Sequence, residues 1–239
     1  VYYYEYQLYD DSEAIAALRE DEIIFYDEVM RGYSLSHDIY EEIVLKHIFE
    51  NLYIKKEDCK SFFEEIADSL VVRKNLRLWL KDKLVQKTEG IKDFIIEVFY
   101  TSKISSIWQD EILITLMSIE DNQISINFIK SMLTRDEYKL LFRAIFLLNT
   151  TCRIINDDFW NKILTSEEQK SANLYRSTKP TGAGWGYIFN FIYENLTTIE
   201  WKPQNIMLVI ECLYSWTSHN VKGIETKHAG LIALYLYNK

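Results

Sequence analysis

Apolar positions recur with helical spacing along most of this chain. Three stretches, beginning at Ile91, Tyr138 and Ile206, place apolar side chains at i, i+3, i+4, i+7 and i+8, as expected for a helix with one buried face. We expect further helices near residues 57–68, 71–85, 104–117, 121–133, 156–164, 186–196 and 226–237. Short polar links join many of these segments, which favours packing between neighbours in sequence. Helices in series of this kind are typical of an α-solenoid-like array of degenerate helical repeats.

The start of the chain shows a different pattern. Residues 1–10 are rich in tyrosine, which favours a strand, and a short helix is expected from Ser12 to Arg19. Residues 22–26 are expected to form a strand, residues 27–32 a turn and residues 33–36 a returning strand, so the sequence predicts a β-hairpin. The order helix, hairpin, helix is typical of a winged helix, in which the hairpin forms the wing.

The helix after the hairpin would have Ser36 or Asp38 as its N-cap. Its expected apolar side consists of Tyr40, Ile43, Val44, Ile48 and Leu52. We therefore predict a small winged-helix remnant over residues 1–55, followed by a helical-repeat array over residues 56–239. The fold class that follows is all-α with one N-terminal β-hairpin.

The amino-acid composition supports the all-α fold class and excludes some classes of binding partner. Two prolines and seven glycines among 239 residues favour helix throughout. A net charge of −9 disfavours broad binding to nucleic acid or anionic membranes. Three widely spaced cysteines indicate free thiols in a reducing cytoplasm, and no apolar run reaches the roughly 18 residues of a membrane span. Because the chain begins with Val1, we expect it to belong to a longer polypeptide.

His37 and Asp38 form the sharpest local signal, at the junction between a strand and a helix. A histidine ring nitrogen in this place can donate to a phosphate or a carbonyl, and helix N-termini favour anions. The alternative is a structural histidine followed by an N-cap aspartate.

A second candidate is an interaction face. Arg73, Arg77 and Lys81 follow i, i+4, i+8 spacing and would share one side of a helix, and we add Trp185 as an aromatic contact. A solvated face with nearby acids explains the basic residues equally simply. The glycine-rich segment 181–186 lacks the ending of a phosphate-binding loop, so Trp185 could instead anchor a loop to the core. Neither metal-ligand spacing nor a catalytic triad is recognisable.

The sequence Tyr33-Ser-Leu-Ser-His-Asp-Ile-Tyr-Glu-Glu-Ile-Val-Leu45 resembles the end of the winged-helix domain in signal-transduction ATPases with numerous domains, the group of NACHT and NB-ARC proteins. The matching positions are Leu35, Ser36, His37, Asp38 and Glu42, whereas Ile43 stands where an aromatic residue is common. The remaining chain is similar to the helical arrays of large bacterial ATP-binding proteins of this kind. The resemblance implies that His37 touches bound ADP, and that ATP or ADP with Mg²⁺ is held by an ATPase core outside these residues.

We therefore expect a regulatory scaffold without catalytic activity or a cofactor of its own. Its expected partners are an upstream ATPase core of the same polypeptide and a protein ligand or neighbouring subunit, without a membrane. The alternative is a winged-helix nucleic-acid-binding regulator, although residues 38–52 contain only Lys46 and His47 against four acidic residues. A third reading is a helical enzyme with a pocket near Trp185, which would require converging titratable groups.

Overall fold

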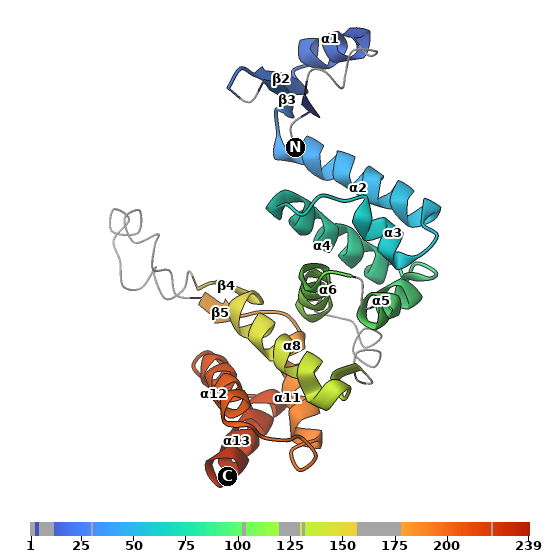
Figure 1. Ribbon diagram of the computed structural model, residues 1–239. Coiled ribbons are helices and arrows are strands. Elements are labelled where there is room, and N and C mark those ends of the chain that lie inside the picture. Colours follow the sequence, from blue (N-terminus) through green and yellow to red (C-terminus); the bar gives the residue numbers. More distant parts are fainter. Residues whose placement is uncertain are drawn as a thin grey trace, which may run out of the picture. The chain divides into compact units, whose positions relative to one another are not determined.

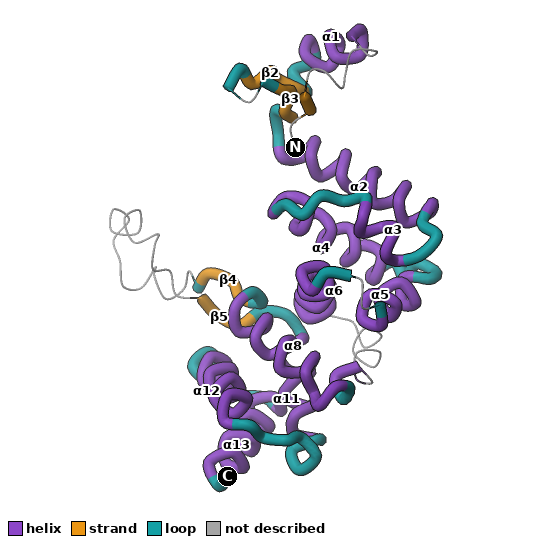
Figure 2. The backbone as a smooth tube through the Cα atoms, viewed as in Figure 1, coloured by secondary structure: helices purple, strands orange, loops and turns teal. Residues whose placement is uncertain are grey.

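The computed structural model describes residues 3–4, 12–29, 31–101, 104–119, 130, 132–156, 178–220 and 222–239. Most of this part of the chain is helical, with short strands confined to two small sheets (Figures 1 and 2). The predicted all-α class with an N-terminal hairpin is therefore confirmed. Two compact units are present: the first is Val1–Trp79 with Tyr100–Ile104, and the second is Leu80–Phe99 with Ser105–Lys239.

The first unit begins with a small sheet and continues with three helices. Its elements are β1 (Tyr3–Tyr4), α1 (Ser12–Glu20), β2 (Ile24–Asp27), β3 (Gly32–Leu35), α2 (Asp38–Lys55), α3 (Cys59–Glu64) and α4 (Leu70–Val85) as far as Trp79. The three strands pair antiparallel in the order β1-β3-β2. Tyr26 lies opposite Tyr33 in the hairpin, and their rings meet edge to face at 5.1 Å. This cross-strand aromatic pair stabilises the predicted hairpin.

Three aromatic rings from α2, α3 and α4 form the centre of the first unit. We call Phe49, Phe62 and Trp79 the Trp79 cluster; their ring centroids lie between 5.6 and 6.3 Å apart. The Trp79 indole Nε1 donates to Glu50 Oε2 at 3.0 Å. Because this cluster joins α2 to α4, the first unit extends to Trp79 and does not end at residue 55 as predicted.

Two other predictions for this unit need correction. The buried side of α2 is formed by Leu45 and Phe49, whereas Ile43 and Val44 of the predicted apolar side are exposed. The helix expected near 57–68 is shorter, because α3 starts only after a capping box in which Asp58 and Ser61 exchange hydrogen bonds.

The second unit contains the longer helical series. Its elements are α5 (Ile91–Tyr100), α6 (Ser106–Ser118), the 3₁₀ turn η3 (Asp136–Tyr138), α8 (Lys139–Thr150), β4 (Arg153–Ile155), β5 (Thr178–Pro180), α11 (Gly184–Glu194), α12 (Pro203–Thr217) and α13 (Ile224–Tyr237). Helix α8 packs on α6 and α12, and α11 packs on α13 (Figure 1). The predicted face of α5 is confirmed, since Ile91, Phe94, Ile95 and Val98 are buried. The helix predicted near 156–164, and most of that near 121–133, lie outside the described residues.

A short sheet and a second aromatic cluster organise this unit. The strand β5 precedes the glycine-rich segment 181–186 and pairs antiparallel with β4. We call Trp185, Phe189 and Trp216 the Trp185 cluster; their ring centroids lie between 5.7 and 6.3 Å apart. A Cβ at Gly184 would lie 2.5 Å from the Met117 Cβ, so only glycine allows α11 to approach α6 this closely.

An unusual turn precedes α8. Asp136, Glu137 and Tyr138 have φ values of 48°, 56° and 62°, so three consecutive residues other than glycine adopt the left-handed conformation. Such residues each cost roughly 1–2 kcal/mol relative to right-handed backbone. Packing of α8 through Leu141 and Ile145, both fully buried, holds the turn in place.

Candidate functional site

The residue with the clearest sequence signal, His37, lines an open groove in the first unit. The groove has a volume of about 600 Å³ and is lined by Arg19, Glu22, Ile24, Phe25, Tyr26, Glu28, Ser36 and His37. Its walls are the end of α1, the strand β2 and the start of α2. Of the residues that line the groove, Ser36 and His37 belong to the segment Tyr33–Leu45 that carries the family resemblance.

His37 is the N-cap residue of α2, but its side chain does not cap the helix. Its backbone is extended, with φ −139° and ψ 143°, and its carbonyl accepts a hydrogen bond from Tyr40 N at 3.0 Å. The imidazole is exposed, lies 5.8 Å from the Tyr40 ring, and makes no hydrogen bond within the described part of the chain. Asp38 is the first residue of α2, so the predictions that Asp38 or Ser36 caps this helix are wrong.

The groove combines donors for an anion with aromatic surface. Arg19 is exposed and has no ion pair among the residues that the structure places. Arg19 and His37 can donate to phosphate or carboxylate oxygens, and Phe25, which is 48% exposed, offers a ring face. Glu22 and Glu28 also line the groove and limit its positive potential. The arrangement can hold an anion between Arg19 and His37.

The basic residues predicted as an interaction face lie on one continuous helix, α4. Arg73 pairs with Asp68, with 2.5 Å between Nε and Oδ1, and Arg77 is half-buried. Lys81 is exposed. The pairing of Arg73 with an acid fits the alternative reading, a solvated face with acidic neighbours.

Trp185 cannot belong to an interaction face, and that prediction is wrong. Its side chain is fully buried, and its indole Nε1 donates to the Cys152 carbonyl at 3.0 Å. The ring stacks on Trp216 with an interplanar angle of 27°. The glycine-rich segment thus leads into α11 with Trp185 as its core anchor, which was the simpler alternative.

Polar groups close to Trp185 satisfy one another. Arg153 donates to the Thr178 hydroxyl at 2.7 Å, to the Thr178 carbonyl at 2.8 Å, and to the Ser215 hydroxyl. Burial lowers the pKa of Arg153, although the nearby Cys212 opposes this. Burial also raises the pKa of the Cys212 thiol to about 12, against the effect of Arg153. A thiol with so high a pKa is a poor nucleophile at neutral pH, so these groups do not form a reactive site.

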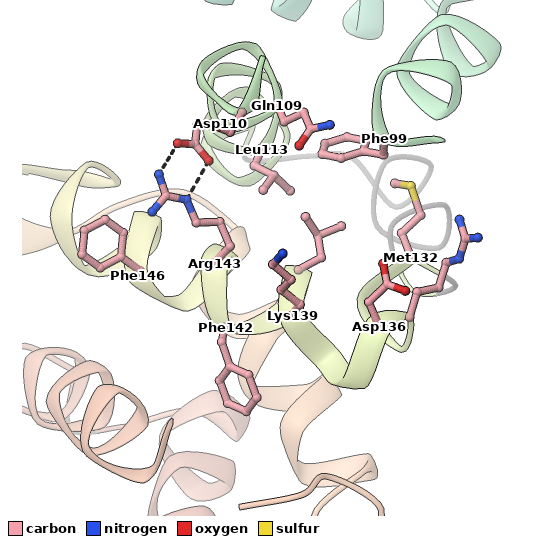
Figure 3. A pocket seen from close by; sticks show the side chains of 13 residues that line it. Phe99, Gln109, Asp110, Leu113, Met132, Asp136, Lys139, Phe142, Arg143 and Phe146 are labelled. Atoms are coloured by element: carbon pink, nitrogen blue, oxygen red, sulfur yellow. Dashed lines mark hydrogen bonds and ion pairs between the residues drawn. The ribbon is translucent and has the colours of Figure 1, made fainter. Parts of the chain in front are cut away.

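A second concave site, which the sequence did not reveal, lies between α6 and α8 in the second unit (Figure 3). This α6–α8 cleft has a volume of about 640 Å³. Arg143 donates through Nε to Asp110 Oδ1 at 2.7 Å and through Nη2 to Asp110 Oδ2. This hydrogen bond to Asp110 is the main reason why the pKa of Arg143 is raised, while partial burial opposes it. The spacing of Arg135, Lys139 and Arg143 at i, i+4 and i+8 was the sequence pattern that could have indicated basic residues at this cleft.

Neither site contains a metal centre within the described residues, where histidine, cysteine and acidic side chains do not gather in groups of three. Among the helices that the structure describes, none combines the length and the apolar character needed to cross a bilayer. Comparison of the sequence with models of known protein families gives no match, and comparison with curated proteins gives no significant relative. The resemblance to signal-transduction ATPases therefore supports a proposal only.

Proposed function

We propose that this chain is a non-catalytic regulatory segment of a larger signalling ATPase, which couples the nucleotide state of an upstream core to a protein-interaction surface. In this proposal the first unit senses the nucleotide through His37, and the helical second unit offers the interaction surface. ATP or ADP with Mg²⁺ would be held by the core, and the chain would act in the cytoplasm.

The observation that carries the proposal is the position of His37. Its imidazole is exposed at the start of α2, in a groove with Arg19, and makes no hydrogen bond that would occupy it within the described chain. A histidine whose task is structural usually has a buried or hydrogen-bonded ring. A ring presented at a helix N-terminus is instead placed to donate to an oxyanion, which fits contact with the phosphates of ADP.

The nucleic-acid alternative receives no comparable support. The first turn of α2, which would enter a DNA groove in a winged helix, carries Asp38 and Glu41. Carboxylates at this place repel the phosphate backbone. The third hypothesis, a helical enzyme, required a pocket at Trp185. Among the described residues, Trp185 is instead fully buried and packed against aromatic rings, so this hypothesis gains no support.

The decisive experiment measures ADP affinity in the polypeptide that includes the proposed ATPase core. We expect His37→Ala to weaken ADP binding about tenfold, which corresponds to loss of one charge-assisted hydrogen bond of roughly 1.4 kcal/mol. His47→Ala is the matched control, because His47 is exposed on the same helix but does not line the groove. Isothermal titration calorimetry reports both affinities.

Two results would contradict the proposal. One is equal ADP affinity in the His37→Ala and His47→Ala variants. The other is ATP hydrolysis by the isolated chain that a single substitution within it abolishes, measured as phosphate release. The proposal would also be contradicted if the gene encoded no nucleotide-binding loop upstream of Val1.

A further inference from the structure

The start of the first unit has apolar surface but no enclosed core. Among residues 13–29 and 31–44, Gly32 is the one buried residue, whereas the rest of the unit contains the fully buried Trp79 cluster. A segment of fewer than ~40 residues rarely encloses enough apolar surface to be stable alone. Its apolar side chains remain accessible from outside, as expected for a binding surface.

These apolar side chains gather on one face of the small sheet. Ile24 lies directly opposite Leu35 in the hairpin, and Tyr33 precedes Leu35 by two residues, so all three share a face. Helix α1 covers part of this face at one side, and α2 borders it at another. An open hollow of about 240 Å³ results. It is lined mainly by six apolar or aromatic side chains, Ile15, Leu18, Ile24, Tyr33, Leu35 and Val44.

A second hollow adjoins the first. It has a volume of about 190 Å³ and shares Leu35 and Val44 with the first hollow. Ile48 of α2 and Ile66 of the α3–α4 link, both half-buried, extend its lining. We call the two hollows together the Val44 groove. Since Val44 and Leu18 are each 38% exposed, a partner can contact the lining directly.

The charges around the Val44 groove are acidic. Glu41 and Glu65 line it, and no lysine or arginine is among the lining residues that the structure describes. Glu65 is exposed at the C-terminal end of α3. Residues 12–49, which carry most of the groove, contain nine acidic residues against three basic ones. Seven acidic residues remain when Asp27 and Glu41, which interact within the chain, are set aside.

We infer that the Val44 groove binds an amphipathic helix of a partner protein, whose apolar anchors enter the two hollows and whose basic side chain meets Glu65. A helix is the suitable partner because Tyr33 and Leu35 belong to β3, which is paired with β1 on one side and β2 on the other. No strand can be added to β3, so recognition occurs through side chains. Helix-in-groove recognition uses anchors at i, i+3, i+4 and i+7, and electrostatic complementarity selects basic over acidic helices.

The Val44 groove is distinct from the groove at His37. Ile24 is the one residue found in the described lining of both. Arg19 and His37 belong to the other groove, so an anion and a basic helix would bind at different places. The inference therefore goes beyond the proposed function and does not depend on contact between His37 and a nucleotide.

The test uses the full chain and a synthetic helical peptide of about 15 residues, with leucines at i, i+3, i+4 and i+7 and flanking lysines. A second peptide replaces every lysine by glutamate. Binding is followed by fluorescence anisotropy and by ¹³C-methyl NMR of the isoleucines. We expect the basic peptide to bind saturably and to shift the methyl signals of Ile15 and Ile66. The signal of Ile210, which is exposed on α12, should stay unchanged.

A pair of variants on α2 tests the apolar contact. Val44→Lys should weaken the basic peptide about tenfold, because it places a cation between the two hollows. The variant keeps the helix, since lysine has a higher helix propensity than valine. Ile43→Lys is the matched control, because Ile43 is 59% exposed on the same helix and lines neither hollow.

A second pair tests the charge. Glu65→Lys should also weaken the basic peptide about tenfold, and a lysine is favourable at the C-terminal end of α3. Glu57→Lys is the matched control, because Glu57 is exposed in the same unit and lines neither hollow.

The inference is overturned if neither peptide binds, if the acidic peptide binds equally well, or if either groove variant behaves like its control. It is also overturned if the Ile15 and Ile66 signals shift with the concentration of the chain alone, which would assign the groove to a second copy. None of these measurements uses ADP, so failure of the helix site and failure of the sensing role of His37 can be told apart.

Discussion

The two aromatic clusters have nearly the same spacing between ring centroids, and Trp79 and Trp185 differ in the acceptor of their indole N–H. In the Trp79 cluster the indole donates to the side chain of Glu50, in a partly buried position. In the Trp185 cluster the Trp185 indole donates to the backbone carbonyl of Cys152, which is buried and also accepts from Thr181 N, while the Trp216 indole donates to the Thr226 hydroxyl. A side-chain acceptor can be removed by substitution, whereas a backbone acceptor cannot. The hydrogen bond of Trp79 therefore depends on the chemistry of a second residue, whereas that of Trp185 depends on the path of the backbone.

The largest expected effect is loss of an aromatic centre. Trp185→Ala should lower the free energy of unfolding by about 3–5 kcal/mol, because it leaves a cavity and removes a buried hydrogen bond. Trp79→Ala should cost a similar amount, since Trp79 is equally buried. Chemical denaturation followed by circular dichroism measures both. A loss below roughly 1 kcal/mol at either site would mean that the cluster is not a core.

The next largest effect concerns the close approach of the α11 backbone to α6 at Gly184. Gly184→Ala should destabilise the chain by about 1–3 kcal/mol, because the new Cβ would overlap Met117. Gly230→Ala is the matched control: this glycine lies inside α13 and a Cβ there meets nothing within 4 Å. The control should stabilise the chain by about 0.5–1 kcal/mol through higher helix propensity. Thermal denaturation of the two variants should therefore give shifts of opposite sign.

Alkaline pH should weaken the second unit through Cys212. The pKa of its thiol is about 12 in the folded chain and ordinarily 9.0, so the folded state retains a proton that the unfolded state loses. Stability from this group is complete below pH 9 and is lost as the pH rises through 12. The slope should approach ~1.4 kcal/mol per pH unit. Denaturation at increasing pH should show a steeper loss in the natural chain than in Cys212→Ala, and identical slopes would refute the prediction.

The smallest effect tests the side-chain acceptor directly. Glu50→Gln keeps an oxygen acceptor for Trp79 but removes the charge that strengthens the hydrogen bond. We expect a loss of about 1 kcal/mol, measurable by denaturation. A double variant with Trp79→Phe should show less than the sum of the single losses, because the first substitution weakens and the second removes the same hydrogen bond. Full additivity would show that the two residues act independently.

Sequence patterns predicted some elements well, for clear physical reasons. The face of α5 was correct because most of its apolar side chains follow one stripe, while Lys92, Asp93 and Glu97 occupy other positions. The hairpin was correct because β-prone runs flank a turn. On α2 the pattern was ambiguous, since apolar residues such as Ile43 and Phe49 occur around the helix, and only tertiary packing selected Phe49.

The remaining features depend on contacts between distant residues. Strands β4 and β5 have three residues each and pair across a long intervening segment, so neither carries a local signal. The partnership of Arg143 with Asp110 likewise joins positions 33 residues apart. His37 was identified because its signal is local, at the junction of a strand and a helix, but the groove around it required Arg19 from another helix.

The left-handed turn before α8 has an evolutionary consequence. Asp136 and Glu137 are exposed, and exposed positions ordinarily accept almost any residue. Here the positive φ values should exclude valine, isoleucine and proline, while glycine and asparagine should be accepted readily. In a saturation library selected for folding, these surface positions would show the narrow tolerance of a buried core, for reasons of backbone geometry alone.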